Sequence, residues 1–256
     1  MDLLAADIVN RFYTFLWPML RISALLLTAP LFSISAVPRR VRVLAALALT
    51  WFIYPLVEWP LIDPMSAPGL VEIVNQIFIG CVMGLTLQVV VAAVVTAGQA
   101  LANAIGLSMA TLIDPTLGNV PILSQFLLIM AVLIFVGTGG HLLLLSVLLK
   151  SFSAVPIGQS MLNQAVWGKL IAWSSMIFTG ALLISLPVMA VLLLINAGLG
   201  VVTRAAPSLN IFAVGFPAMM LVGILACMLT MESMGLRLQW LWVQAFGVLD
   251  DLMGVR

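Results

Sequence analysis

The sequence predicts an all-α, polytopic membrane protein built of long, kinked apolar helices and helical hairpins. Hydrophobic residues make up 64% of its 256 residues and charged residues only 7%, whereas an average soluble domain is about 25% charged. A soluble fold of this size would have too little polar surface to face water. No charged residue occurs from Ile73 to Ile113, a stretch longer than the roughly 20 residues of one ordinary membrane span.

Two apolar segments are expected at the start of the chain, over residues 12–34 and 43–57, with Arg21 inside the first. A cluster of arginines at 39–42 lies between them, and acidic residues follow the second. Positive charge accumulates on the cytoplasmic side of membrane proteins. This first link is therefore expected in the cytoplasm and the N-terminus outside.

The third segment begins near Val71 and carries small residues at four-residue spacing. Gly80 and Gly84 form one such pair, and Gly98 and Ala102 form another. Small residues allow helices to approach closely in lipid. The spacing leaves two alternatives open, which are packing within the chain and contact with another subunit.

The fourth segment, over 122–149, is interrupted by the sequence VGTGGH. A fifth segment follows over 170–197 and a sixth over 211–231, and an aromatic C-terminal tail occupies 232–256. Residues 1–256 are expected to form a single domain. The lone His141 after the glycines is interpreted as a helix-start residue, with a proton relay as the alternative.

No motif of a hydrolase, metalloprotease or nucleotide-binding enzyme occurs in the sequence. We therefore expect no catalytic activity, no metal site and no cofactor. The net charge of +1 gives no reason to expect nucleic-acid binding. Glycine and proline breaks within apolar segments leave a secondary transporter or ion channel open as an alternative.

Several stretches resemble one known family along nearly the whole chain. Two of them are RISALLLTAPLFSISAVPRRVRVLAALALT, from Arg21, and AGQALANAIGLSMATLIDP, from Ala97. A third is FVGTGGHLLLLSVLLKSFSAVP, from Phe135, and the most specific is LPVMAVLLLINAGLGVVTRAAPSLNIFAVGFP, from Leu186. Together they are similar to the FliR family of flagellar type III export proteins, whose counterpart in virulence injectisomes is the SctT family. Overall likeness favours the flagellar branch.

The resemblance implies a structural subunit of the flagellar protein export gate in the bacterial inner membrane, at the flagellar basal body. One copy would assemble with FliP-like and FliQ-like subunits into a helical pore. FlhB, FlhA and an early rod or adaptor protein at the outer end would be further partners. Unfolded axial proteins would pass through the pore. A subunit of an injectisome is the alternative within the family.

Two sets of site residues are predicted, the first from the resemblance and the second from the small-residue spacing on the third segment together with the family-like block that begins at Leu186. The stretch GLSMATLIDPTLGNVP, residues 106–121, lies where the family has a loop that plugs the pore, and Asp114 would organise its turn. Without the resemblance, the same stretch is also typical of an ordinary loop between helices. The predicted plug residues are Gly106, Met109, Leu112, Ile113, Asp114, Pro115, Leu117, Gly118 and Pro121. The predicted subunit-interface residues are Gly80, Gly84, Gly98, Ala102, Asn196, Gly200, Arg204, Pro207 and Asn210.

Overall fold

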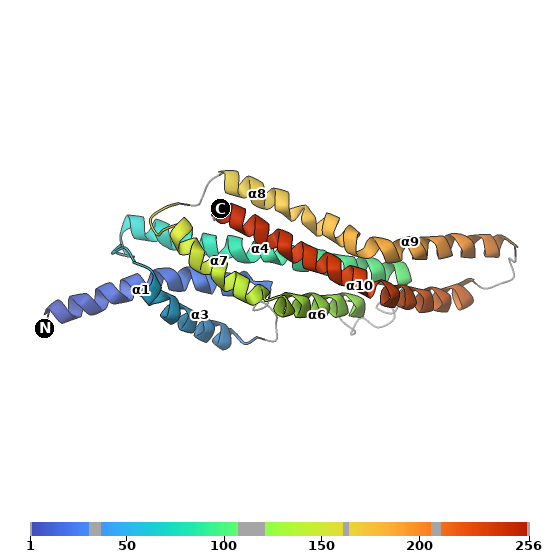
Figure 1. The fold of residues 1–256 in the computed structure, drawn as a ribbon, viewed down its shortest axis with the longest axis horizontal. Coiled ribbons are helices and arrows are strands. Elements are labelled where there is room, and N and C mark those ends of the chain that lie inside the picture. The colour runs from blue at the N-terminus through green and yellow to red at the C-terminus, as the bar shows by residue number, and fades with distance from the viewer. Residues whose placement is uncertain (1, 31–36, 107–120, 161–163, 206–210, 255–256) are drawn as a thin grey trace. The chain divides into compact units, whose positions relative to one another are not determined.

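The computed structural model describes residues 2–30, 37–106, 121–160, 164–205 and 211–254, and its regular elements within these ranges are all helices (Figure 1). The predicted all-α class is confirmed over this part of the chain. In order, the elements are α1 (Asp2–Thr28), α3 (Arg39–Ile53), the 3₁₀ helix η1 (Tyr54–Leu56), α4 (Ala67–Ile105), α6 (Ile122–Gly137), α7 (Gly140–Ala154), α8 (Gln164–Ser174), α9 (Met176–Ala205) and α10 (Ile211–Met253).

Proline and glycine mark several helix ends. Pro38 stands directly before α3 and Pro121 directly before α6, where a residue without an N–H group leaves no helical hydrogen bond unmade. Gly106 follows α4 with a φ of 91°. Gly139 separates α6 from α7 with a φ of 76°. Glycine adopts this left-handed conformation without the steric cost of a side chain, so the predicted interruption of the fourth segment is a break between two helices.

Helix α10 is longer than the sequence indicated. The predicted sixth segment ended at Met231, before Glu232, whereas the helix continues to Met253. Glu232 is exposed, and the Arg237 guanidinium donates a hydrogen bond to the carbonyl of Leu183. Both charged residues are therefore accommodated on the surface of one helix, and most of the predicted aromatic tail is helical.

Within the described ranges, three helical stretches are long and apolar enough to cross a membrane by length and composition. They are α4, the stretch Gln164–Val202 and the stretch Pro217–Met253, with a fourth if α6 and α7 count as one broken span. This is fewer than the six predicted segments. Helix α3 has 15 residues, fewer than the roughly 20 that cross a bilayer, and α1 contains both Pro18 and Arg21.

The chain divides into two compact units. The first consists of Met1–Val89, Gly139–Ser174 and Gln244–Arg256, and the second of Val90–Thr138 and Ser175–Val243. Helices α4 and α10 contribute residues to both. The prediction of a single domain over the whole chain stays a prediction.

In the first unit, α1 packs directly against α4 at two glycines. A Cβ at Gly80 would lie 2.8 Å from the Ala24 Cβ, and one at Gly84 would lie 2.9 Å from the backbone nitrogen of Ala29. Real Cβ atoms do not approach other atoms so closely, so only glycine permits this distance between the helices. Trp17 and Met83 are fully buried, which shows that the two helices belong to the core.

In the second unit, small residues again bring helices together. A Cβ at Gly98 of α4 would lie 2.7 Å from Ser124 Oγ of α6, and this hydroxyl donates a hydrogen bond to the Val95 carbonyl at 3.2 Å. Trp242 of α10 donates a hydrogen bond from its indole nitrogen to the Ala131 carbonyl at 3.2 Å. Polar contacts between helix backbones and side chains thus accompany the close packing.

We expect Gly84→Leu to lower the melting temperature of the purified chain in detergent, because its side chain would collide with Thr28 at the end of α1 and with the backbone of Ala29. Inserting a larger side chain where two helices are already tightly packed lowers the free energy of unfolding by about 1–3 kcal/mol. Gly168→Leu is the matched control, since a Cβ at Gly168 would meet no atom within 4 Å. Size-exclusion chromatography after stepwise heating measures the effect. Equal melting temperatures for the two variants would contradict the close packing of α1 on α4.

Candidate functional site

Arg21 of α1 is completely buried in the first unit, and all three of its guanidinium nitrogens donate hydrogen bonds. Nε donates to Gln76 Oε1 at 2.7 Å. Nη1 donates to the carbonyl of Ser151 at 2.8 Å and to its hydroxyl at 3.1 Å, and Nη2 donates to the Val155 carbonyl at 2.9 Å. The guanidinium carbon lies 4.3 Å from the centre of the Phe152 ring. Arg21 therefore connects α1 to α4 and to the C-terminal end of α7.

Glu72 of α4 provides the buried negative charge near Arg21. The Gln76 amide nitrogen, on the same side chain that accepts from Arg21, donates to Glu72 Oε1. Asn75 donates to the Gln159 carbonyl at 2.7 Å and to Glu72 Oε2 at 3.4 Å. Glutamine thus lies between the two charges and bonds to both. We call Arg21, Glu72, Asn75, Gln76 and Ser151 the Arg21 network.

The Arg21 network offsets the cost of burying charge. Taking an unpaired ion out of water costs several kcal/mol, but here each nitrogen of the guanidinium has an acceptor. Two of these acceptors are the carbonyls of Ser151 and Val155, at the end of α7. The C-terminal end of a helix carries partial negative charge and stabilises a cation. The network therefore holds three segments of the first unit in a defined register.

Arg21 stands out in the sequence as a charge inside an apolar segment, but its partners lie far away along the chain. Glu72 was considered only as one of the acidic residues beside the second link, as a guide to orientation. Glu72, Asn75 and Gln76 lie at positions i, i+3 and i+4, which share one face of a helix. Three polar residues on one face of an otherwise apolar helix were the signal for this network.

The predicted interface residues on α4 are buried within the chain itself. Gly80 and Gly84 face α1, Gly98 faces α6 and Ala102 has no exposed surface. These four residues pack against other helices of the same chain. This is one of the two alternatives that the sequence left open. Their participation in a subunit contact stays a prediction.

The predicted interface residues near the end of α9 are exposed. Asn196 and Gly200 lie on its surface, and Arg204 lies in its last turn. The neighbouring Leu193 and Leu194 are 71% and 74% exposed. This end of α9 therefore presents polar and apolar groups that its own chain leaves uncovered. Two further predicted residues lie outside the described part of the chain, namely Pro207 and Asn210.

Only the two ends of the predicted plug are described. Gly106 terminates α4, and Pro121 precedes α6. The stretch therefore connects two helices of the second unit. The other predicted plug residues lie outside the described residues, and these are Met109, Leu112, Ile113, Asp114, Pro115, Leu117 and Gly118.

The described residues offer little of the chemistry that enzymes use. They contain no group of three or more His, Cys, Asp or Glu side chains that could hold a metal ion. Cys81 and Cys227 are free thiols. His141 is exposed in the first turn of α7. The Arg21 network is the main polar cluster described in the first unit, and its bonds serve packing.

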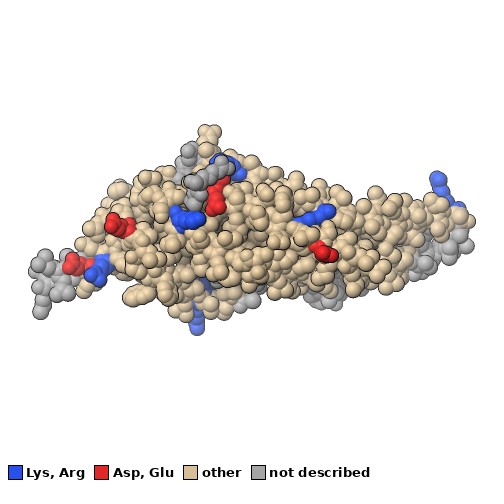
Figure 2. All heavy atoms as spheres, viewed as in Figure 1, with Lys and Arg blue, Asp and Glu red and all other residues tan. Residues whose placement is uncertain are grey.

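The surface carries few charges and much apolar area. Figure 2 shows one face, on which basic and acidic side chains are scattered among uncharged residues. In the most apolar part of α4, 67% of the residues are buried, compared with 33% in the stretch Gln164–Val202 and 22% in the stretch Pro217–Met253. Helix α4 is therefore covered by its own chain, whereas α9 and α10 leave apolar side chains for lipid or another protein.

The chain matches the family described as bacterial export proteins, family 1, over residues 12–245. It is 37% identical to the flagellar biosynthetic protein FliR of Escherichia coli strain K12, over 93% of this chain and 92% of that protein. It is 35% identical to the FliR protein of Pectobacterium carotovorum subsp. carotovorum, over 96% and 95%. The FliR protein of Bacillus subtilis strain 168 is 31% identical, over 87% and 88%. The resemblance inferred from the sequence is confirmed.

We expect Arg21→Met to destabilise the chain by about 3–5 kcal/mol, because Glu72 would remain buried without the cation. Arg21→Lys should recover only part of this loss, since an ammonium lacks the planar fork that reaches acceptors on α4 and α7 together. Thermal unfolding of the detergent-solubilised chain measures both effects. Arg11→Met is the control, because Arg11 lies exposed on the same helix. An unchanged melting temperature for Arg21→Met would contradict the stabilising role of the network.

Proposed function

Because the chain belongs to the bacterial export proteins, family 1, we propose that it is a structural subunit of the flagellar type III protein export gate. In this proposal it lies in the bacterial inner membrane at the flagellar basal body and forms a pore with FliP-like and FliQ-like subunits. Unfolded axial proteins pass through the pore. FlhB, FlhA and an early rod or adaptor protein are further partners. The chain needs no cofactor and catalyses no reaction.

The exposed surface at the end of α9 is the observation that carries this proposal. Leu193 and Leu194 are exposed close to Asn196, and Arg204 is exposed in the last turn of the same helix. Apolar side chains alone would be satisfied by lipid. An amide and a guanidinium facing hydrocarbon are costly, because lipid tails offer no hydrogen bonds. A neighbouring subunit can cover the apolar groups and bond to the polar ones, so this surface favours assembly with other proteins.

The buried charges argue against the alternative of a secondary transporter. In transporters, ionisable residues at membrane depth face a cavity or an ion pathway. Arg21 instead uses all three nitrogens in bonds to its own chain, and Glu72 accepts from both Asn75 and Gln76. These groups therefore serve packing better than they serve transport.

The names of the relatives support the flagellar branch. The similar proteins of Escherichia coli, Pectobacterium carotovorum and Bacillus subtilis are all named flagellar biosynthetic protein FliR. We therefore propose a flagellar role, with an injectisome subunit as the alternative. In either branch the chain would act as part of a secretion pore.

Residues 106–121 form the plug of the resting pore in this proposal. Gly106 ends α4 and Pro121 precedes α6, so the stretch is anchored by a helix at each end. Irregular backbone at membrane depth is tolerated where protein or a water-lined cavity surrounds it. The apolar residues between these ends would seal the pore, with methionine as the most adaptable of them.

Native mass spectrometry of a gently solubilised complex tests the assembly. After co-expression with FliP-like and FliQ-like subunits of the same bacterium, we expect one complex that contains a single copy of this chain. Arg204→Ala should lower recovery of the complex more than Arg204→Lys, because the charge at the end of α9 would be lost. Recovery of the unaltered, co-expressed chain free of both partners would contradict the proposed function.

Deletion of residues 109–118 tests the plug. The complete gate should still assemble but should admit small solutes, because the apolar stopper is removed. Leu112→Ser combined with Ile113→Ser should leak less than the deletion and more than Met109→Ala, since polar side chains would wet the seal. Influx of a small fluorescent solute into cells, compared at equal recovery of the complex, measures the leak. Identical influx with and without the deletion would indicate that this stretch only connects two helices and does not seal the pore.

A further inference from the structure

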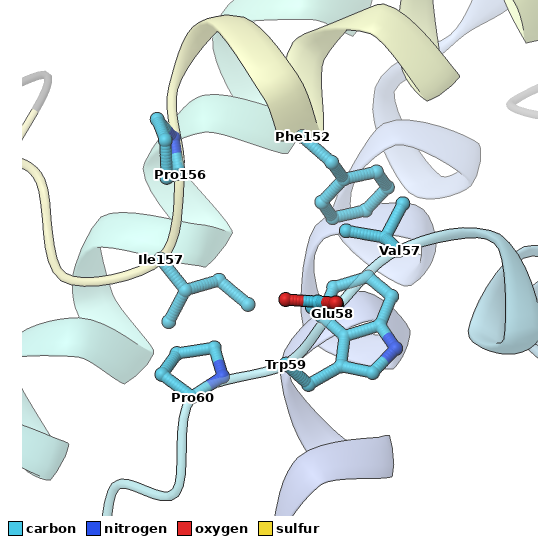
Figure 3. Close-up of a pocket in the computed structure, with 7 residues that line it drawn as sticks. All are labelled: Val57, Glu58, Trp59, Pro60, Phe152, Pro156 and Ile157. Carbon is cyan, nitrogen blue, oxygen red and sulfur yellow. The ribbon is translucent and has the colours of Figure 1, made fainter.

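A pocket of about 350 Å³ lies in the first unit, on a part of the chain that the proposed function does not use (Figure 3). Its lining comes from two non-helical links and from the end of α7. Residues 57–60 form one wall after η1, and Pro156 and Ile157 form the other after α7. The ring of Phe152 contributes from α7 itself. A volume of this order accommodates a side chain or small ligand.

The wall that contains Trp59 is fixed in place. Its indole stacks on Tyr54 with ring centres 6.2 Å apart and planes 11° apart, and its nitrogen donates to the Tyr54 carbonyl at 2.8 Å. The Tyr54 hydroxyl shares a hydrogen bond of 2.8 Å with Thr14 of α1. This link is therefore tied to the core of the first unit.

The opposite wall is held by the Arg21 network. Arg21 donates to the carbonyl of Val155, the residue before Pro156, and Asn75 donates to the carbonyl of Gln159. Phe152 meets Trp59 edge to face, with ring centres 5.2 Å apart and planes 84° apart. Both walls are thus held by contacts within the chain, and a preorganised site loses little conformational entropy when it binds.

Glu58 is the charged residue of the lining, and Figure 3 shows its carboxylate among the labelled side chains. Glu58 is exposed at the mouth of the pocket, and within the described residues it has no hydrogen bond or ion pair to its own chain. The remaining lining side chains are apolar except the indole of Trp59, whose N–H already bonds to Tyr54. An ionised carboxylate only accepts hydrogen bonds. The group that would complement this pocket is therefore a cation that donates them.

We propose that this pocket receives a lysine or arginine side chain of a partner subunit, with Glu58 as its counter-charge. A carboxylate forms strong charge-assisted hydrogen bonds with either cation, and the edge-to-face pair of Trp59 and Phe152 adds aromatic surface. Pro60 and Ile157 would contact the aliphatic stem of the side chain. The proposal rests on the proposed function only for the existence of a partner.

The residues that line the pocket favour a basic protein side chain over a lipid headgroup or a metal ion. A phosphatidylethanolamine headgroup would bring a phosphate beside its ammonium, and the pocket offers no basic residue to pair with that phosphate. A divalent metal ion needs several oxygen ligands, and the lining supplies one carboxylate. A basic side chain needs one carboxylate and apolar walls, which is what the pocket provides.

Site-specific photo-cross-linking in cells that make the whole assembly tests the proposal. A benzophenone amino acid in place of Ile157 should cross-link to a partner peptide that carries a nearby lysine or arginine. Glu58→Gln should lower the yield about tenfold, the effect of losing a charge-assisted bond. Glu232→Gln should leave it unchanged, since Glu232 is an exposed carboxylate of α10 outside the pocket. Equal melting temperatures of the variants would establish that folding is intact.

Charge reversal then identifies the pair. Glu58→Lys should abolish the cross-link, and changing the identified basic residue of the partner to glutamate should restore it. A cross-link to lipid or within this chain would overturn the proposal, as would a yield that Glu58→Gln does not alter in an intact complex. Those results would leave the proposed function standing. Failure of the unaltered chain to assemble with any partner would instead overturn the proposed function and, with it, the partner assigned here.

Discussion

Arg21 donates hydrogen bonds from the middle of α1 to α4 and to the end of α7, and the arrangement of the first unit depends on these bonds. Small residues bring helices together in lipid but do not by themselves fix their register. Gly80 lies against the α1 backbone at Arg21 itself, one turn along α4 from Gln76. The missing side chain lets α1 come close enough for the guanidinium to reach its acceptor. Close packing and directional bonding therefore act at the same level of the helix pair.

The same contacts connect the interior of the first unit to its surface. The ring of Phe152 lies against the Arg21 guanidinium and also packs edge to face with the indole of Trp59. Val155 accepts a hydrogen bond from Arg21 and begins the link to α8. Removing the buried charge would thus affect the packing of residues 57–60 and of the link after α7. All of the contacts involved belong to the first unit. The conformation of these two surface links therefore depends on the buried contacts of Arg21.

Composition and turn residues predicted much of the fold. The low charge and high apolar content indicated membrane helices, and Pro121 and Gly139 each stand directly before a helix. Charges were poorer guides to boundaries, because Glu232 follows the predicted end of the sixth segment and yet lies inside α10. The partners of Arg21 were not predictable, since they lie 55 to 134 residues away along the chain. Hydrogen bonds over such separations follow from tertiary packing, which local patterns do not encode.

Helix α10 contains 43 residues, which corresponds to roughly 64 Å at 1.5 Å per residue. The hydrocarbon core of a bilayer is about 30 Å thick, and tilting absorbs only part of the difference. In the most apolar part of this helix, the chain buries only 22% of the residues. In the proposed assembly, a newly synthesised copy would therefore expose apolar turns to water until the partner subunits enclose them. We expect the cell's membrane proteases to remove orphan copies, so that incorporation, rather than synthesis, sets how much of this protein accumulates.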